Sequence, residues 1–152
     1  MDAIDKQLIN VLQKEGKLTM KELSSRLELS ITPVYERVRR LERNEVITGY
    51  HAEVDATKIG LGLEAFCSVT LDSHKIEYLL EFEEEIQKFD EVLECYHMAG
   101  SYDFLVKIIV TDMDAYGEFI NKKLASMKSI GLVNSHMVLK KIKRTNVLPI
   151  TS

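Results

Sequence analysis

Apolar residues recur at helical spacing in the N-terminal part of the chain. In residues 2–15 they stand at i, i+4, i+7 and i+8, which marks one face of a helix, and are Ile4, Leu8, Val11 and Leu12. Gly16 predicts the end of this helix. A second segment opens with Thr19 and Glu22, the spacing of a capping box, and ends near Glu28. Both segments are therefore predicted to be helices.

Residues 29–43, LSITPVYERVRRLER, predict a short turn followed by a helix with two different faces. Ser30 is the expected N-cap, whose hydroxyl can accept a hydrogen bond from a first-turn amide, and Pro33 is tolerated inside that turn. The apolar face consists of Val34, Val38 and Leu41. The polar face consists of Thr32, Glu36, Arg39, Arg40 and Arg43. Two short helices about three residues apart, after a longer amphipathic helix, form a helix-turn-helix pattern.

The basic face of this third helix has two interpretations. Arginine can bond phosphate oxygens or pair with guanine edges, which suits a helix laid into the major groove of DNA. A charged face is equally typical of a solvated helix that packs on one side only. The helix alone does not decide between them, so the context must.

A different pattern follows the third helix. Residues 46–55 alternate enough to be a strand or extended link, and Gly60 and Gly62 mark a turn. Segments rich in β-forming residues then predict four strands, at 64–71, 92–98, 103–110 and 131 to about 144. Two helices are predicted between them, at 74–89 with Ser73 as its cap, and after a cap formed by Thr111 with Asp114. The order β-α-β-β-α-β predicts a ferredoxin-like unit with the almost wholly apolar segment 103–110 inside the sheet, and an α+β chain overall.

Composition fits one domain of ordinary size or two small ones. The chain has 152 residues, of which 45% are hydrophobic and 29% charged, and its apolar runs are far shorter than a membrane span. The N-terminus has no cationic region followed by a long apolar core, so we expect a cytoplasmic protein without a secretory signal. Cys67 and Cys95 are expected to be buried, reduced thiols.

The net charge of −4 is unevenly distributed. Residues 1–50 carry a net charge of about +1 and the remainder about −5, with a local basic cluster at Arg37–Arg43. Because a nearly neutral DNA-binding unit releases few counterions, such a protein would need more than one DNA contact site per assembly.

Common catalytic and metal-binding patterns are missing from the sequence. It has no phosphate loop, no dinucleotide-binding glycine motif and no nucleophile elbow. The four histidines share no metal-ligand spacing, and they are His51, His74, His97 and His136. We therefore expect no enzyme, no metal and no cofactor.

Gly100–Asp103 is a candidate ligand loop. Asp103 opens a strongly apolar strand, where an unpaired carboxylate would be costly, and Gly100 lets backbone amides approach a ligand closely. Amides beside a carboxylate match an amino acid, with the amides binding its α-carboxylate and Asp103 its α-ammonium. The alternative is a plain turn between two strands.

Both halves of the chain resemble the Lrp/AsnC (leucine-responsive, feast/famine) family of transcriptional regulators. The resemblance rests on DAIDKQLINVLQKEGKLT, KELSSRLELS, TPVYERVRRLE and VITGYHAEVD, and on VLECYHMAGSYDFLVKIIVTDMDAY in the second half. It implies a winged-helix-like helix-turn-helix DNA-binding domain at 1–50, an extended linker at 51–62, and a ferredoxin-like regulatory (RAM) domain for effector binding and oligomerisation at 63–152.

The resemblance also implies residue roles. Glu22–Leu27 would be the positioning helix and Ser30–Asn44 the recognition helix, ending at a left-handed Asn44 because Glu45 replaces the family's usual glycine. The expected DNA-binding residues are Ser30, Thr32, Pro33, Glu36, Arg37, Arg39, Arg40 and Arg43. The expected effector-binding residues surround a cleft between regulatory domains and are His97, Met98, Ala99, Gly100, Ser101, Tyr102, Asp103, Met113, His136, Met137 and Val138. The polar His97 and His136 disfavour leucine as the effector.

Together these features predict a sequence-specific DNA-binding transcriptional regulator whose assembly and DNA binding respond to a small effector, expected to be an amino acid. The partners would be double-stranded DNA, the amino acid and further copies of the chain, as homodimers that associate to octamers in the family. Two alternatives stay open. One is a nucleoid-associated, DNA-compacting protein, which would differ in the ratio of its affinities for specific and non-specific DNA. The other is an effector-binding protein without specific DNA recognition, which would lack salt-dependent binding to duplex DNA.

Overall fold

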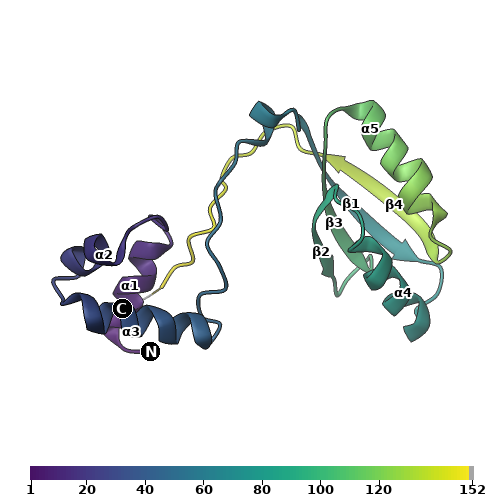
Figure 1. The fold of residues 1–152 in the computed structure, drawn as a ribbon. Coiled ribbons are helices and arrows are strands. Elements are labelled where there is room, and N and C mark those ends of the chain that lie inside the picture. Colours follow the sequence, from purple (N-terminus) through teal and green to yellow (C-terminus); the bar gives the residue numbers. More distant parts are fainter. Residues whose placement is uncertain (151–152) are drawn as a thin grey trace. The chain divides into compact units, whose positions relative to one another are not determined.

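The structure, a computed structural model, describes residues 1–150 and divides into two compact units (Figure 1). A helical unit comprises Met1–Glu53 and residues 142–150, and a sheet unit comprises Val54–Lys141. The helical unit contains α1 (Ala3–Leu12), α2 (Met20–Arg26) and α3 (Ile31–Arg43). The sheet unit contains η1 (Ala56–Ile59), β1 (Leu63–Leu71), α4 (Ile76–Ile86), β2 (Val92–His97), β3 (Phe104–Val110), α5 (Met113–Glu118), η2 (Phe119–Lys123), η3 (Leu124–Ser126) and β4 (Ile130–Met137).

Three helices enclose the core of the helical unit, as the apolar spacing predicts. Its buried side chains come from all three helices and are Leu8, Ile9, Leu12, Leu23, Val34, Val38 and Leu41. The predicted capping box of α2 is present, since Thr19 and Glu22 each accept the other's backbone N–H. A second capping box, between Asp2 and Asp5, starts α1. Because the residues after Leu12 form turns, α1 is shorter than the predicted 2–15.

Left-handed glutamates follow both helices of the helix-turn-helix motif. The φ angle is 54° at Glu28 and 55° at Glu45. After α3, the Val46 N–H donates to the Leu41 carbonyl, five residues earlier, which is the hydrogen bond of a Schellman motif. Asn44 has φ −90° and ψ 11°, so the expectation of a left-handed Asn44 is wrong. The motif places its left-handed residue one position later, at Glu45, where the resemblance implies a glycine.

Replacing Glu45 by glycine is expected to stabilise the helical unit by about 0.5–1 kcal/mol. A left-handed residue with a side chain costs about 1–2 kcal/mol, and the greater freedom of glycine in the unfolded chain offsets part of that gain. Urea unfolding of the full chain measures the change. Glu36→Gly, inside α3, is the matched control and should lose about 1 kcal/mol. Equal destabilisation by both glycines would contradict the assignment of strain to position 45.

A four-stranded antiparallel sheet in the order β2-β3-β1-β4 forms the second unit. The predicted βαββαβ order and α+β class are confirmed, and β3 lies inside the sheet. Alternate residues of β1 and β3 share one core with Phe82 of α4 and Phe119. Phe82 stacks on Phe104, with ring centroids 4.3 Å apart. Because α4 and α5 both pack into this core, they cover the same face of the sheet (Figure 1).

The two helix starts in the sheet unit differ from their predicted positions. The N-cap of α4 is Lys75, without a side-chain hydrogen bond, and not Ser73. The N-cap of α5 is Asp112, whose carboxylate accepts the Ala115 N–H, and not the Thr111–Asp114 pair. Several polar residues stand side by side at both sites, so composition alone did not single out the capping residue.

The extended segments are shorter than predicted. β4 ends at Met137 and not near Arg144. The Val138 N–H donates to the carbonyl of Glu64, which is close to the beginning of β1, so β1 offers no further residues for β4 to pair with. No strand forms in residues 46–55 of the described chain.

The C-terminal segment belongs to the helical unit, whereas the sequence placed residues 63–152 in one domain. The Gln13 side chain holds both polar backbone groups of Leu148, donating to its carbonyl (3.2 Å) and accepting its N–H (2.6 Å). Ile150 packs against the helical core. A glutamine and a lone apolar residue so far apart in sequence carry no periodic signal, which explains why the pattern did not predict the contact.

Candidate functional site

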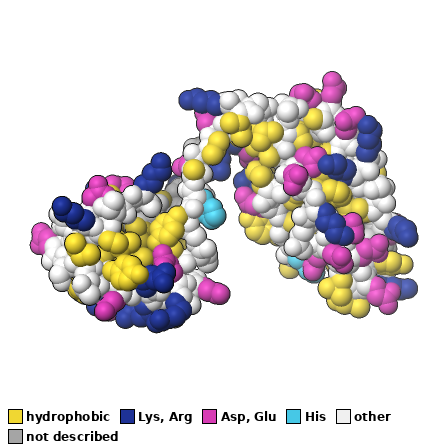
Figure 2. Space-filling view, viewed as in Figure 1, with side chains coloured by type: hydrophobic (Ala, Val, Ile, Leu, Met, Phe, Trp, Pro, Cys, Tyr) yellow, Lys and Arg dark blue, Asp and Glu magenta, His cyan; other side chains and the backbone are white. Residues whose placement is uncertain are grey.

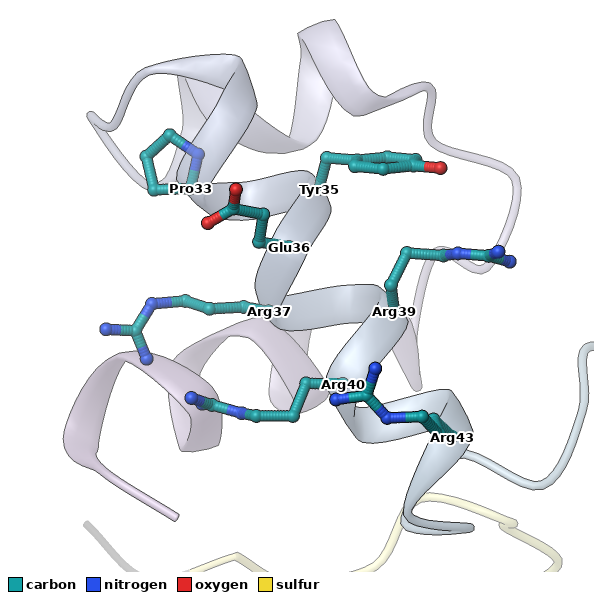
Figure 3. A pocket seen from close by; sticks show the side chains of 7 residues that line it. All are labelled: Pro33, Tyr35, Glu36, Arg37, Arg39, Arg40 and Arg43. Atoms are coloured by element: carbon teal, nitrogen blue, oxygen red, sulfur yellow. The ribbon is translucent and has the colours of Figure 1, made fainter.

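One side of α3 is a basic, solvent-exposed surface with a shallow hollow along it. The hollow is lined by Pro33, Tyr35, Glu36, Arg37, Arg39, Arg40 and Arg43 (Figure 3). Lys and Arg side chains gather along the lower edge of the helical unit in Figure 2, where Figure 1 places α3. The structure thus brings together six of the eight residues predicted to contact DNA. Ser30 and Thr32 are exposed at the start of the helix.

Two of the four arginines on α3 are bound by carboxylates of α1. Arg37 Nη1 lies 2.6 Å from Asp2 Oδ2 and 2.7 Å from Asp5 Oδ1. Arg40 Nη2 lies 2.8 Å from both oxygens of Asp5. The Asp5 side chain is only 2% exposed. Burial acts to raise the pKa of Asp5, but the Asp2 N–H and the two arginines outweigh it, so the pKa lies below its usual value.

The other two arginines are available to a ligand. The Arg39 side chain is 67% exposed and lies 4.0 Å from Glu42, which is at most a weak surface pair. Arg43 forms no ion pair with any residue in the described part of the chain. In Figure 3 the Arg37 and Arg40 side chains extend toward α1, whereas Arg39 extends away from it. The four arginines therefore form two chemically different pairs.

Sequence reasoning missed the exposed apolar residues of this surface. Ile31 and Tyr35 are each 49% exposed, one helical turn apart. Their positions outside the apolar stripe of α3 could have revealed them, since apolar side chains can contact a thymine methyl group. Ser30 occupies the predicted N-cap position, but its side chain makes no capping hydrogen bond, so that part of the prediction is wrong.

The candidate ligand loop ends at a carboxylate that already has partners. Asp103 Oδ2 accepts the Leu71 N–H at 2.8 Å, and Oδ1 lies 2.9 Å from His74 Nε2. The backbone of Asp103 also bonds Met98 and Val69, which fixes the base of the loop. Gly100 has φ 153° and faces open space. The Leu71 N–H and His74 thus compensate for the burial of the Asp103 carboxylate.

The residues expected to bind an effector fall into two groups within one sheet unit. Residues 97–103 lie where β2 turns into β3, and the ring of His97 stacks on Phe104 with centroids 4.8 Å apart. Met113 follows the far end of β3, and residues 136–138 pair with the start of β1, which is beside that same far end. The fold therefore separates the two groups by the length of β3.

Metal-binding groups, the two cysteines and the helices were the other candidates for function. Within residues 1–150 no three His, Cys, Asp or Glu side chains are grouped so that they could hold a metal ion. Cys67 is fully buried beside the Tyr116 hydroxyl, and burial raises the pKa of its thiol. Burial likewise raises the pKa of the half-buried Cys95 to about 11, so both cysteines remain thiols. None of the helices described here combines the length and apolar character needed to cross a membrane.

Comparisons with known proteins match both units. Residues 1–48 fit a winged helix-turn-helix DNA-binding family, and residues 64–148 fit the Lrp/AsnC ligand binding domain. The leucine-responsive regulatory protein of Escherichia coli strain K12 is 35% identical over 150 residues, which cover 99% of this chain and 92% of that protein. A transcriptional regulator of Neisseria meningitidis, solved as a complex with L-Met, has a TM-score of 0.94 and 34% identity, covering 98% of this chain and 96% of that one. An AsnC family transcriptional regulator from Agrobacterium tumefaciens has a TM-score of 0.93 and 34% identity, covering 98% and 97%.

A helix-turn-helix unit with an outward-facing basic helix, joined to a ferredoxin-like ligand-binding unit, defines a two-domain DNA-binding transcriptional regulator. The chain belongs to the Lrp/AsnC family. The resemblance seen in the sequence is confirmed, and so is the predicted function as a DNA-binding transcriptional regulator with a ligand-binding domain. The two solved structures named above are likewise of transcriptional regulators.

Proposed function

We propose that the exposed side of α3 is the surface that recognises DNA. The observation that supports it is that α3 has two different sides, one basic and exposed and the other apolar and buried in the core. The proposed contacts are Ser30, Thr32, Pro33, Glu36, Arg37, Arg39, Arg40 and Arg43. Arg39 and Arg43 are assigned the base contacts, since a free guanidinium can pair with guanine O6 and N7. A protein acting on DNA in this way would work in the cytoplasm.

We infer that the effector is an amino acid bound between copies of the chain. The similar Neisseria meningitidis regulator is described as an L-Met complex, which makes an amino acid the first class to test. Within one sheet unit, the 97–103 loop and the group formed by Met113 with residues 136–138 lie at opposite ends of β3. A site that contains both groups therefore requires a second copy, which couples effector binding to assembly.

Asp103 is the proposed partner of the effector's α-ammonium. Its side chain is 13% exposed, so it is reachable from the loop. A carboxylate has about four lone-pair positions, and the Leu71 N–H and His74 use one on each oxygen. The existing hydrogen bonds thus orient the carboxylate and leave it able to accept from a ligand.

The uncovered face of the sheet is the proposed dimer surface. α4 and α5 pack against the other face, and on the uncovered one Tyr96 is 48% and Leu132 55% exposed. Both residues lie in edge strands, where Tyr96 pairs with Leu105 and Leu132 with Thr70. Exposed apolar side chains on both edges fit a self-complementary interface. Dimers formed there would associate further, to octamers as the family implies.

An Asp103→Asn variant is expected to lose amino-acid-induced thermal stabilisation. A ligand at 100 times its Kd stabilises the native state by about 2.7 kcal/mol, which is several degrees in Tm. Asparagine keeps an acceptor for the Leu71 N–H but removes the charge that pairs with an ammonium. The measurement is a thermal-shift screen of the twenty amino acids, beginning with L-methionine, on both proteins.

Glu118→Gln, an exposed charge change in the same unit, is the matched control and should respond like the wild type. The same Tm shift in Asp103→Asn and the wild type would rule out Asp103 as the ammonium partner. No shift with any amino acid would refute the proposed effector class.

A further inference from the structure

The first turn of α1 neutralises half of the positive charge on α3. Asp2 and Asp5 supply two carboxylates to Arg37 and Arg40, at N–O distances between 2.6 and 2.8 Å. Within residues 1–150, Arg43 has no ion-pair partner and Arg39 lies 4.0 Å from Glu42, and both are the proposed base-contacting arginines. The proposed DNA-binding surface therefore contains acidic groups in contact with the cations that would bind phosphate.

The two carboxylates differ in burial and hence in what they can do. Asp5 is 2% exposed and contacts both arginines, so it fixes where the guanidiniums lie. Asp2 is 52% exposed, and of the two arginines it pairs with Arg37 only. A phosphate can displace an exposed carboxylate from a guanidinium, whereas a buried one stays in place. Asp2 is accordingly the group with which DNA competes.

We propose that Asp2 is a specificity-determining residue: its carboxylate occupies Arg37 in the free protein and so weakens phosphate binding that does not depend on sequence. This proposal rests on the proposed function of α3 as the DNA-binding surface. Phosphate contacts supply most of the affinity for non-specific DNA, and base contacts supply the discrimination. A built-in competitor for one phosphate contact therefore lowers non-specific affinity and leaves the readout by Arg39 and Arg43 intact, so discrimination increases.

The structure also supplies the variant that isolates this effect. Asp2 is the N-cap of α1, and asparagine caps a helix about as well as aspartate does. In Asp2→Asn, Arg37 keeps its 2.7 Å contact with the buried Asp5, so the guanidinium stays in place and only the competing charge is lost. Asp2→Ser, another capping residue, serves as a second variant, and circular dichroism verifies that each protein is folded.

The experiment measures binding of the full chain to a fluorescent duplex of mixed sequence over a series of KCl concentrations. For Asp2→Asn we expect, for each recognition helix, that the plot of log K against log salt steepens by about 0.9 and that affinity near 0.1 M salt rises roughly 5- to 10-fold. In an Arg37→Gln background, Asp2→Asn should change neither quantity, because the freed guanidinium is then absent.

Glu53→Gln makes the same change in net charge from an exposed residue that forms no ion pair with any residue in the described range. It should leave the salt slope at the wild-type value. An unchanged slope and affinity in folded Asp2→Asn and Asp2→Ser, or equal effects of Asp2→Asn and Glu53→Gln, would overturn the proposal while leaving the DNA-binding assignment standing. Failure of the wild type to bind any duplex would overturn both.

Discussion

Replacing Asp5 with alanine is expected to lower the free energy of unfolding of the helical unit by about 3 kcal/mol. Breaking a buried ion pair costs about 3–5 kcal/mol, and the lower end applies because Arg37 and Arg40 are 23% and 45% exposed and can reach water. The variant also removes the acceptor for the Asp2 N–H and so opens the capping box of α1. Urea unfolding followed by circular dichroism measures the loss.

The pH dependence provides a second readout for Asp5. Because its folded pKa lies below the ordinary value of 3.8, the ionised carboxylate stabilises the native state above that pH, and the contribution is lost as the pH falls through the folded pKa. Asp5→Ala should therefore remove part of the acid sensitivity of the wild type. Asp90→Ala, an exposed control, should change stability by less than about 0.5 kcal/mol. If Asp5→Ala were as mild as this control, the carboxylate would not hold α1 against α3.

Apolar periodicity was a reliable guide to which elements exist. Val34, Val38 and Leu41 are buried as their spacing requires, and the continuous apolar run of β3 does lie inside the sheet. Burying apolar area is the main favourable contribution to folding, so the spacing of apolar residues in the sequence predicts which elements form. The ends of elements depend instead on single hydrogen bonds, such as the Asp112 cap of α5, and neighbouring polar residues compete for those positions.

Long-range polar contacts were beyond the reach of sequence reasoning. The pairing of Asp5 with Arg40 joins residues 35 positions apart, and the contact between Gln13 and Leu148 joins residues 135 apart. Neither has a periodicity, and each is decided by how the helices pack. For the same reason the basic face looked uniform in the sequence, although Arg37 and Arg40 are paired and Arg39 and Arg43 are not.

A double variant, Arg39→Gln with Arg43→Gln, is expected to lower the affinity for a specific duplex at least about 100-fold. A good bidentate contact between arginine and guanine contributes about 1–3 kcal/mol of discrimination, and a dimer would lose these contacts in both recognition helices. Both side chains are exposed on α3, so stability should not change. Lys14→Gln with Lys17→Gln removes the same charge from exposed positions of the same unit and is the matched control.

The most direct test compares binding by the wild type, the arginine variant and the lysine control. Duplexes selected from a randomised pool by the wild type serve as the specific DNA, with a mixed-sequence duplex as the reference, both by fluorescence anisotropy at fixed salt. If α3 reads DNA as proposed, the wild type binds the selected duplex at least about 1,000-fold more tightly than the reference. The arginine variant should lose most of that ratio, and the lysine control should keep it. An arginine variant that retains the wild-type ratio would contradict the assignment of α3 as the recognition surface.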